Sequence, residues 1–203
     1  MDKKLVKSLV LVVLGIVVMG TGIGMVSKIG IGVDSFTAVI NGISFRTGLT
    51  LGTITALANA ILCVIGYILC KKNVGLATIL FIFISKWPVD FGYTHMIAGD
   101  NLVVKIILFV ISVFIIALGA AMFIVSGMGA NAYDAVTLGI CERLNLKDKF
   151  VYVKYAMDGF MLIVAFIIGG PIGLGTIISL ALIGIFMKFC QKHLIRIFRL
   201  EEQ

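Results

Sequence analysis

The chain has 203 residues, of which 61% are hydrophobic and 13% charged, and its mean hydropathy is +1.17. So little polar surface cannot cover a water-soluble globule. The composition therefore predicts an all-α polytopic membrane protein, and the lipid bilayer is its expected partner. The formal net charge of +7 comes from basic residues scattered over several membrane flanks, which argues against a nucleic-acid partner.

Six apolar segments are long enough to cross a bilayer, since a spanning helix needs about 20 mainly apolar residues. They cover residues 6–27, 49–70, 73–92, 102–125, 151–169 and 172–191. The first apolar run is too long for a cleaved signal peptide and no small-x-small cleavage site follows it, so we expect this segment to be retained.

The basic residues predict the orientation of these six spans. Thirteen of the 17 Lys and Arg residues fall on one side, so the positive-inside bias predicts a multi-pass protein of the cell membrane with both termini in the cytoplasm. These are Lys3, Lys4, Lys7, Lys71, Lys72, Arg143, Lys147, Lys149, Lys154, Lys188, Lys192, Arg196 and Arg199.

One segment of the chain recurs 97 positions later. Residues 30–43 (GIGVDSFTAVINGI) match residues 127–140 (GMGANAYDAVTLGI) at six of fourteen positions, and VGLATI at 74–79 matches IGLGTI at 172–177. Each copy then spans three helices, and an odd number of crossings inverts the second copy relative to the first. The sequence predicts a 3+3 inverted-topology repeat, with units at 1–98 and 99–203.

The repeated motif predicts a break in the helix that precedes it. Two glycines so close together permit positive φ and close backbone approach, which interrupt a helix. The glycines expected to break the two helices are Gly30, Gly32, Gly127 and Gly129.

A short helix is expected to follow each break, at residues 34–42 and 131–139. Asp34 and Asn131 stand at the N-cap positions, with Thr37 and Asp134 three residues later. Helices of two turns, ended by Gly42 and Gly139, are too short to span and are interpreted as broken or re-entrant elements that meet near the midplane. The alternative is a surface turn with a cap at the membrane edge.

A second polar pair lies within the predicted spans. Asn59 aligns with Asp158 at a shift of 99, and both have apolar neighbours. An aspartate near the centre of a span costs about 2.5–3.5 kcal/mol on insertion scales, so Asp158 is a candidate functional residue. The alternative is a solvated pair with Lys154, one helical turn earlier.

The segment KWPVD at 86–90 offers a third candidate near the outer end of the third span. Lys86 and Asp90 are four residues apart and share a helix face, while Pro88 is expected to kink or end the helix. The pair is interpreted either as a possible outer gate or as an interface anchor, with Trp87 in the aromatic belt.

The Gly-x-Gly segment followed by Tyr133-Asp134, together with Gly-Leu-Gly-Thr at 173–176, resembles the YczE/YyaS/YitT-type bacterial integral membrane proteins. The resemblance covers nearly the whole chain in length and helix count, and it implies a small prokaryotic protein of the cell membrane. The first copy departs from this pattern, because Thr37 replaces the acid and the acid stands at Asp34.

The sequence thus favours a small transporter with a midplane site between two inverted repeats, coupled to protons or cations, acting on a small molecule or ion and able to form homo-oligomers. The alternative is a non-transporting component, either a solute-binding subunit or an accessory protein of another membrane system. No motif indicates an enzyme, a cofactor or a metal site. The candidate substrate-binding residues are Asp34, Ser35, Thr37, Asn41, Asn59, Asn131, Tyr133, Asp134, Thr137 and Asp158.

Overall fold

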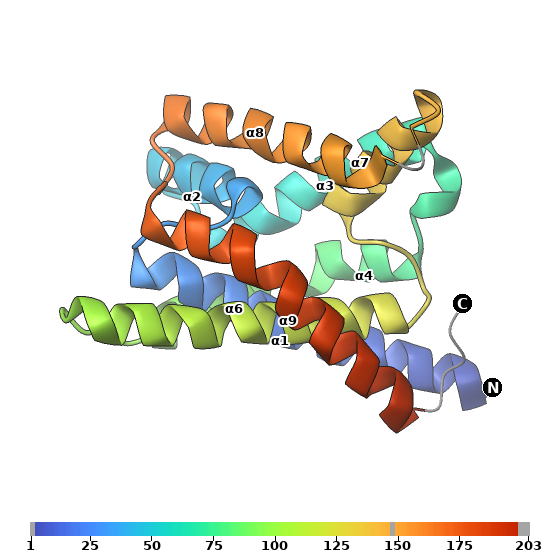
Figure 1. Cartoon of the computed structure of the whole chain (residues 1–203), viewed down its shortest axis with the longest axis horizontal. Coiled ribbons are helices and arrows are strands. Elements are labelled where there is room, and N and C mark those ends of the chain that lie inside the picture. Colours follow the sequence, from blue (N-terminus) through green and yellow to red (C-terminus); the bar gives the residue numbers. More distant parts are fainter. Residues whose placement is uncertain (1–2, 147–148, 199–203) are drawn as a thin grey trace.

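A computed structural model describes residues 3–146 and 149–198, and every regular element within them is helical (Figure 1). Five helices of this described part of the chain are long and apolar enough to cross a membrane, in agreement with the composition. They are α1 (Lys3–Ile29), α3 (Leu51–Leu69), α6 (Leu102–Val125), α8 (Phe150–Ile168) and α9 (Leu174–Phe198).

The sixth predicted span is a bent pair of helices. α4 (Leu76–Ile84) and α5 (Lys86–His95) meet at Ser85 with a bend of 46°. Pro88 explains the break, because its nitrogen has no proton to donate to the carbonyl of Ile84. With this pair as one span, the six helices match the six predicted segments, and the kink near Pro88 is confirmed.

Two shorter helices lie between the spans, α2 (Ser35–Thr47) and α7 (Ala132–Arg143), and Lys71–Asn73 forms the 3-10 turn η1. The prediction that Gly42 and Gly139 end them was wrong. Both glycines lie inside their helices, where a Cβ would approach Ile168 Cγ1 and Leu69 Cβ, each at 2.7 Å. They serve close helix packing, and α2 instead ends at Gly48, which has a φ of 71°.

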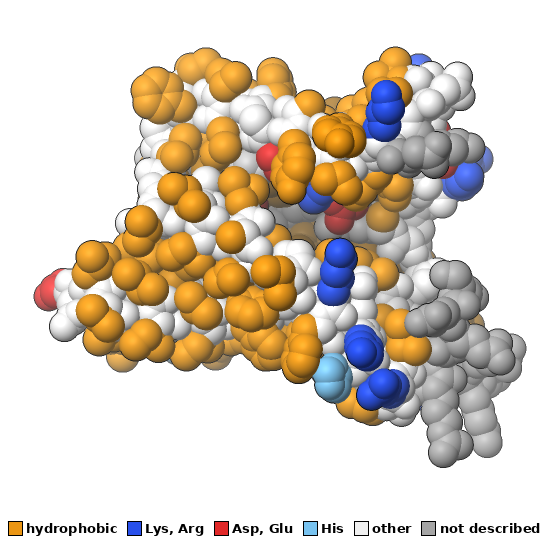
Figure 2. Space-filling model, viewed as in Figure 1, with side chains coloured by type: hydrophobic (Ala, Val, Ile, Leu, Met, Phe, Trp, Pro, Cys, Tyr) orange, Lys and Arg blue, Asp and Glu red, His pale blue; other side chains and the backbone are white. Residues whose placement is uncertain are grey.

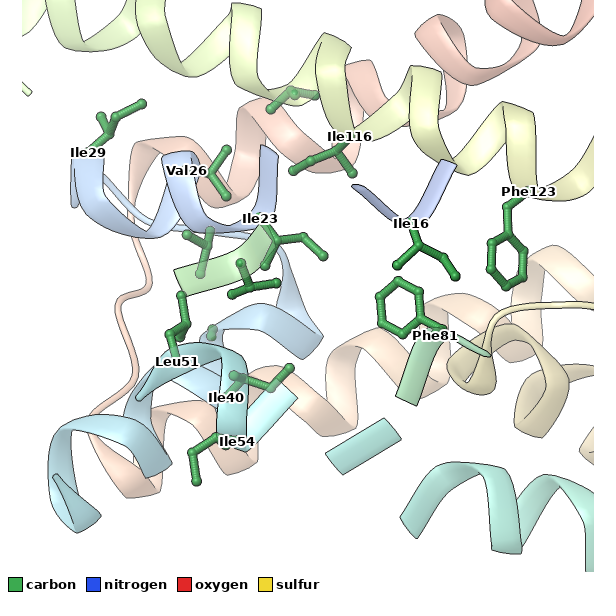
Figure 3. Packing of buried hydrophobic residues seen from close by; sticks show 14 of the residues in the cluster. Ile16, Ile23, Val26, Ile29, Ile40, Leu51, Ile54, Phe81, Ile116 and Phe123 are labelled. Atoms are coloured by element: carbon green, nitrogen blue, oxygen red, sulfur yellow. The ribbon is translucent and has the colours of Figure 1, made fainter. Parts of the chain in front are cut away.

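The core is built around α1, which packs against α6 on one side and α5 on the other. Glycines permit these contacts, since a Cβ on Gly15 would lie 2.9 Å from the carbonyl oxygen of Gly119, and one on Gly20 would lie 2.9 Å from Pro88 Cγ. Large apolar side chains fill the remaining space. In Figure 3, Ile16 of α1 lies near Phe81 and Phe123, whose rings meet edge to face at 6.2 Å.

The two ends of the molecule differ in charge. α1 begins and α9 ends at the same end, and Figure 2 shows basic side chains gathered there and an acidic group at the opposite end. Of the basic residues expected on one side, Lys147 and Arg199 lie outside the described residues. Lys154 departs from the expected flank position, because it lies within α8 and pairs inward, as set out below.

Candidate functional site

The helix breaks lie at the two Gly-x-Gly segments, as predicted. Gly30 and Gly127 have φ values of 74° and 67°, and Gly32 and Gly129 have φ values of 103° and 121°. Side chains with a Cβ rarely adopt such values, so each segment requires glycine. Corresponding glycines of the two segments therefore share one conformation.

Each break packs against the start of a helix from the other half of the chain. The N–H of Gly175 donates to the carbonyl of Ile31 at 2.8 Å, and the N–H of Ala77 donates to the carbonyl of Met128 at 3.1 Å. Two further bonds join the same segments, from Val33 N to Pro171 O and from Ala130 N to Asn73 O. These hydrogen bonds pair backbone groups that have no partner within a helix. Non-helical backbone needs such partners at membrane depth.

Asp34 and Asn131 cap the helices that follow the breaks. The Asp34 carboxylate accepts the N–H of Thr37 at 3.1 Å, and the Asn131 side chain accepts the N–H of Asp134 at 2.9 Å. Both N-cap predictions are confirmed. Because each cap starts a helix that runs outward from the break, the N-terminal ends of α2 and α7 face the interior of the molecule (Figure 1).

The two N-terminal ends meet at Asp158, which lies at the middle of the nineteen residues of α8. Ser35 Oγ, from the first turn of α2, donates to Asp158 Oδ1 at 2.6 Å. Tyr133 Oη, from the first turn of α7, donates to the same oxygen at 2.8 Å. A carboxylate that joins the two breaks is the arrangement expected if polar residues of both halves form one site. Asp34 caps the same end of α2 as Ser35 and directly precedes it in the chain.

A second group of contacts surrounds Asp134, beside the first. Lys154 Nζ lies 2.6 Å from Asp134 Oδ1, and Asn131 Nδ2 donates to Asp134 Oδ2 at 2.8 Å. The Lys154 ammonium also lies 5.0 Å from the centre of the Tyr133 ring, a cation–π distance. Lys154 therefore pairs with Asp134, and the alternative of a solvated Lys154–Asp158 pair was wrong.

The cluster lies beside a hollow in the surface. Figure 2 shows this hollow between α7 and α8 above and α6 and α9 below, with acidic and basic side chains at its upper margin. Asp34, Asp134, Asp158 and Lys154 are all partly exposed. With three carboxylates and one ammonium among these described residues, the cluster carries more acidic than basic groups.

Three predicted site residues lie apart from the cluster. Asn59 is buried and its side chain donates to the carbonyl of Thr55 in its own helix, at 2.8 Å. Thr137 likewise donates to the carbonyl of Tyr133 at 3.0 Å. Asn41 is buried further along α2, where it donates to Ser27 Oγ at 2.9 Å.

Asp90 has a different local role from the one that its spacing to Lys86 suggests. Its carboxylate accepts the N–H of Gly52 at 2.7 Å and the hydroxyl of Thr50 at 2.9 Å. It therefore holds the start of α3, and it forms no ion pair with Lys86, both of them described residues. Lys86 and Trp87 are exposed, as an interface anchor requires.

Sequence reasoning missed two members of the cluster, Phe36 and Lys154. The Phe36 ring stacks on Tyr133 with centroids 5.3 Å apart. These two residues occupy the same position of the repeated motif, so their equivalence was the available signal. For Lys154, the spacing to Asp158 suggested only a solvated pair within α8, whereas its actual partner, Asp134, lies on α7.

The described residues contain no group of three His, Cys, Asp or Glu side chains that could hold a metal ion. The nine α-helices of residues 3–146 and 149–198, with their apolar spans and an interior polar cluster, define a multi-pass helical membrane protein. The chain belongs to the family of unknown function DUF6198, whose model matches residues 6–192.

Two of the similar proteins come from Bacillus subtilis (strain 168), and they confirm the resemblance inferred from the motifs. The uncharacterized protein YyaS is 29% identical over 187 residues, covering 89% of this chain and 92% of YyaS. The uncharacterized membrane protein YczE is 23% identical over 176 residues, covering 86% and 81%. An uncharacterized protein of Haemophilus influenzae is 24% identical over 183 residues, covering 90% and 83%. No solved structure matches this chain.

Proposed function

We propose that this protein is a small transporter of the bacterial cell membrane, which moves a small solute through a site between two inverted three-helix repeats. One observation carries the proposal: the N-terminal ends of α2 and α7, which follow equivalent breaks, converge on Asp158 in the interior. In membrane proteins, broken helices of this kind form substrate and ion sites between repeats.

Several equivalent contacts support the inverted repeat. The ranges Leu51–Leu69 of α3 and Phe150–Ile168 of α8 coincide at a shift of 99. α2 packs on α8 as α7 packs on α3. Thr78 and Thr176 accept the N–H groups of Gly75 and Gly173, both at 3.2 Å. An inverted pair of repeats would produce each of these correspondences.

One departure from this symmetry supports alternating access. α3 packs along both α4 and α5, whereas α8 and α9 barely touch within residues 149–198. The hollow of Figure 2 lies in this second gap. If the two halves exchange conformations, closure of α8 on α9 and separation of α3 from α4 and α5 would expose the site on the opposite side. The positive-inside bias assigns the present opening to the cytoplasm.

The charges support coupling to a proton or cation. Asp158 receives two hydrogen bonds at one oxygen, and within the described residues no group donates to the other, Oδ2. A carboxylate so placed in the interior of a membrane protein is costly unless it is protonated or meets a cation. The pathway itself would use binding and movement alone, without a chemical step on the solute.

The test is flux into liposomes that contain only this protein. Small amines, amino acids, vitamins and inorganic ions are offered one at a time, with a pH-sensitive dye trapped inside the liposomes. We expect uptake of at least one solute, lost in Asp158→Asn and kept in the matched control Asp100→Asn, an exposed aspartate before α6.

Two results would count against transport. If a solute binds the purified protein but never crosses the liposome membrane, the alternative of a binding subunit or accessory component is correct. If a solute crosses at the same rate with Asp158→Asn, the pathway lies elsewhere. Binding is read as a rise in melting temperature, since a ligand at 100 times its Kd adds about 2.7 kcal/mol.

A further inference from the structure

A second cavity lies at the end of the molecule opposite the basic end. It has a volume of about 490 Å³ and lies between the last turns of α2, the turn before α3 and the C-terminal half of α5. Phe45, Leu49, Leu51 and Tyr93 supply apolar wall, while Asn41, Thr50, Asp90 and Thr94 supply polar atoms. None of these residues belongs to the cluster around Asp158.

Asn41 lines the cavity and carries a buried acceptor without a partner. Its side chain is fully buried, and its Nδ2 donates to Ser27 Oγ and to the carbonyl of Thr37, both at 2.9 Å. Its Oδ1 has no hydrogen-bond partner. Leaving such an acceptor unpaired costs about 1–3 kcal/mol, so this position favours a molecule that donates a hydrogen bond.

Asp90 gives the same cavity a negative charge. It accepts from Gly52 N–H with Oδ1 and from the Thr50 hydroxyl with Oδ2, which leaves further lone pairs on both oxygens. The Tyr93 ring lies in the wall, with the Lys28 ammonium 5.0 Å from its centre. The Lys28 ammonium therefore occupies one face of this ring, and the Asp90 carboxylate carries the negative charge of the cavity.

The cavity lies in line with the central cluster along α2. Asn41 is six residues from Ser35, which corresponds to about 9 Å along a helix. A solute held beside Asn41 would thus be one short step from Asp158, with the packed first turns of α2 between the two positions.

We propose that this cavity is an outer binding site for a small organic ammonium ion. The ammonium group donates to Asn41 Oδ1 and lies near the Asp90 carboxylate, while its apolar part contacts Phe45 and Leu49. The inference extends the proposed transport function by naming the class of solute, and it rests on that function for its role as an entry site. Binding itself is testable without transport.

The first experiment measures the charge preference of the cavity. Thr94→Cys is made in a chain whose four native cysteines are replaced by serine or alanine, and the purified protein reacts with cationic and anionic thiosulfonates of similar size. Relative to a small free thiol, we expect the cationic reagent to react about tenfold faster than the anionic one, because a charged cleft concentrates counter-ions.

The second experiment measures occupancy with three probes of similar size: propylammonium, propanol and propionate. We expect propylammonium to slow the labelling of Thr94→Cys in a saturable way, and propanol and propionate to leave it unchanged. Asp90→Asn, which keeps an oxygen to accept the Gly52 N–H, is expected to abolish both the charge preference and the protection. Asp100→Asn is the matched control and should change neither.

The outcomes separate this inference from the transport proposal. Equal protection by all three probes, or by none, would overturn the ammonium site and leave water as the partner of Asn41. Flux that persists in that case leaves transport standing. Protection without flux in liposomes would keep the site and refute transport. If Asp90→Asn does not fold, Asn41→Leu removes the free acceptor and must abolish the protection.

Discussion

The hydroxyls of Ser35 and Tyr133 donate to one oxygen of Asp158, so each can partly replace the other. We expect Tyr133→Phe to lower the free energy of unfolding by about 1.5–3 kcal/mol, the usual contribution of a hydrogen bond to a charged group. Because Phe36 still stacks on the remaining ring, packing is kept. The measurement is a double-mutant cycle with Ser35→Ala, read by thermal melting in detergent. Additive losses would contradict a shared acceptor.

The Lys154–Asp134 pair is partly exposed, with 37% of the lysine side chain and 27% of the aspartate side chain accessible. We therefore expect Lys154→Met to change stability by less than about 1 kcal/mol. The same change removes the one ammonium from the cluster and should tighten the binding of cationic solutes, measured by calorimetric titration. Lys72→Met, which removes an exposed ammonium paired with the partly exposed Glu142 outside the cluster, is the control. Weaker cation binding in Lys154→Met would show that the lysine attracts the ligand instead.

Among the elements, the two breaks should tolerate the least change. Gly32→Ala and Gly129→Ala each place an alanine in a backbone conformation with positive φ. The added Cβ would also approach the backbone of Gly173 or Gly75, respectively. Backbone strain alone costs about 1–3 kcal/mol, and the contact with the opposite segment adds to it. Both variants should show a lower melting temperature by fluorescence-detected chromatography. Gly99→Ala is the control, since nothing lies within 4 Å of its position.

The starts of the short helices followed from local chemistry, but their ends did not. Gly-x-Gly and an Asp or Asn cap act within a few residues. The sequence therefore predicts correctly the helix break at Gly30 and Gly32 and the N-cap at Asp34. Gly42 lies inside α2 at a close approach to Ile168, a residue that is distant in the sequence. A glycine that ends a helix and a glycine that lets another helix approach look alike in a single chain.

The contacts around Asp158 were predictable where the repeat carried information. Asp34, Tyr133 and Asp158 were found because they recur in altered form or lie within an apolar span. Asn59 satisfied the same criterion, yet its side chain donates to the carbonyl of Thr55 within its own helix. The repeat shows which residues occupy equivalent positions in the two halves. It does not show which of two equivalent residues contacts the other half.

For the whole molecule, the charge difference between its ends predicts sidedness. We expect Asp100→Cys, before α6, to react with a membrane-impermeant maleimide on intact cells, and Asn145→Cys, after α7, to react only after permeabilisation. Both positions are exposed and lie at opposite ends. The four native cysteines are replaced beforehand, and labelling of this cysteine-free protein gives the background. The reverse pattern would invert the topology and place the basic end outside.

The unequal packing of the two halves leads to a prediction about the resting state. α8 lies away from α9 while α3 is packed on α5, so the central cluster should be reachable from the basic end and closed from the other. Lys154→Cys, at a partly exposed position of the cluster, is expected to react with an impermeant thiol reagent in inside-out vesicles and much more slowly in right-side-out vesicles.

A transported solute offered from outside should change this reactivity, because binding to the outward-facing form draws the population towards it. Since a ligand shifts such an equilibrium only by its difference in affinity for the two forms, a solute with equal affinity would leave the labelling rate unchanged. Equal labelling from both sides without solute would contradict a closed outer path. In that case the gap between α8 and α9 would be a fixed lateral opening to the bilayer, and the unequal packing of the two halves would describe one state only.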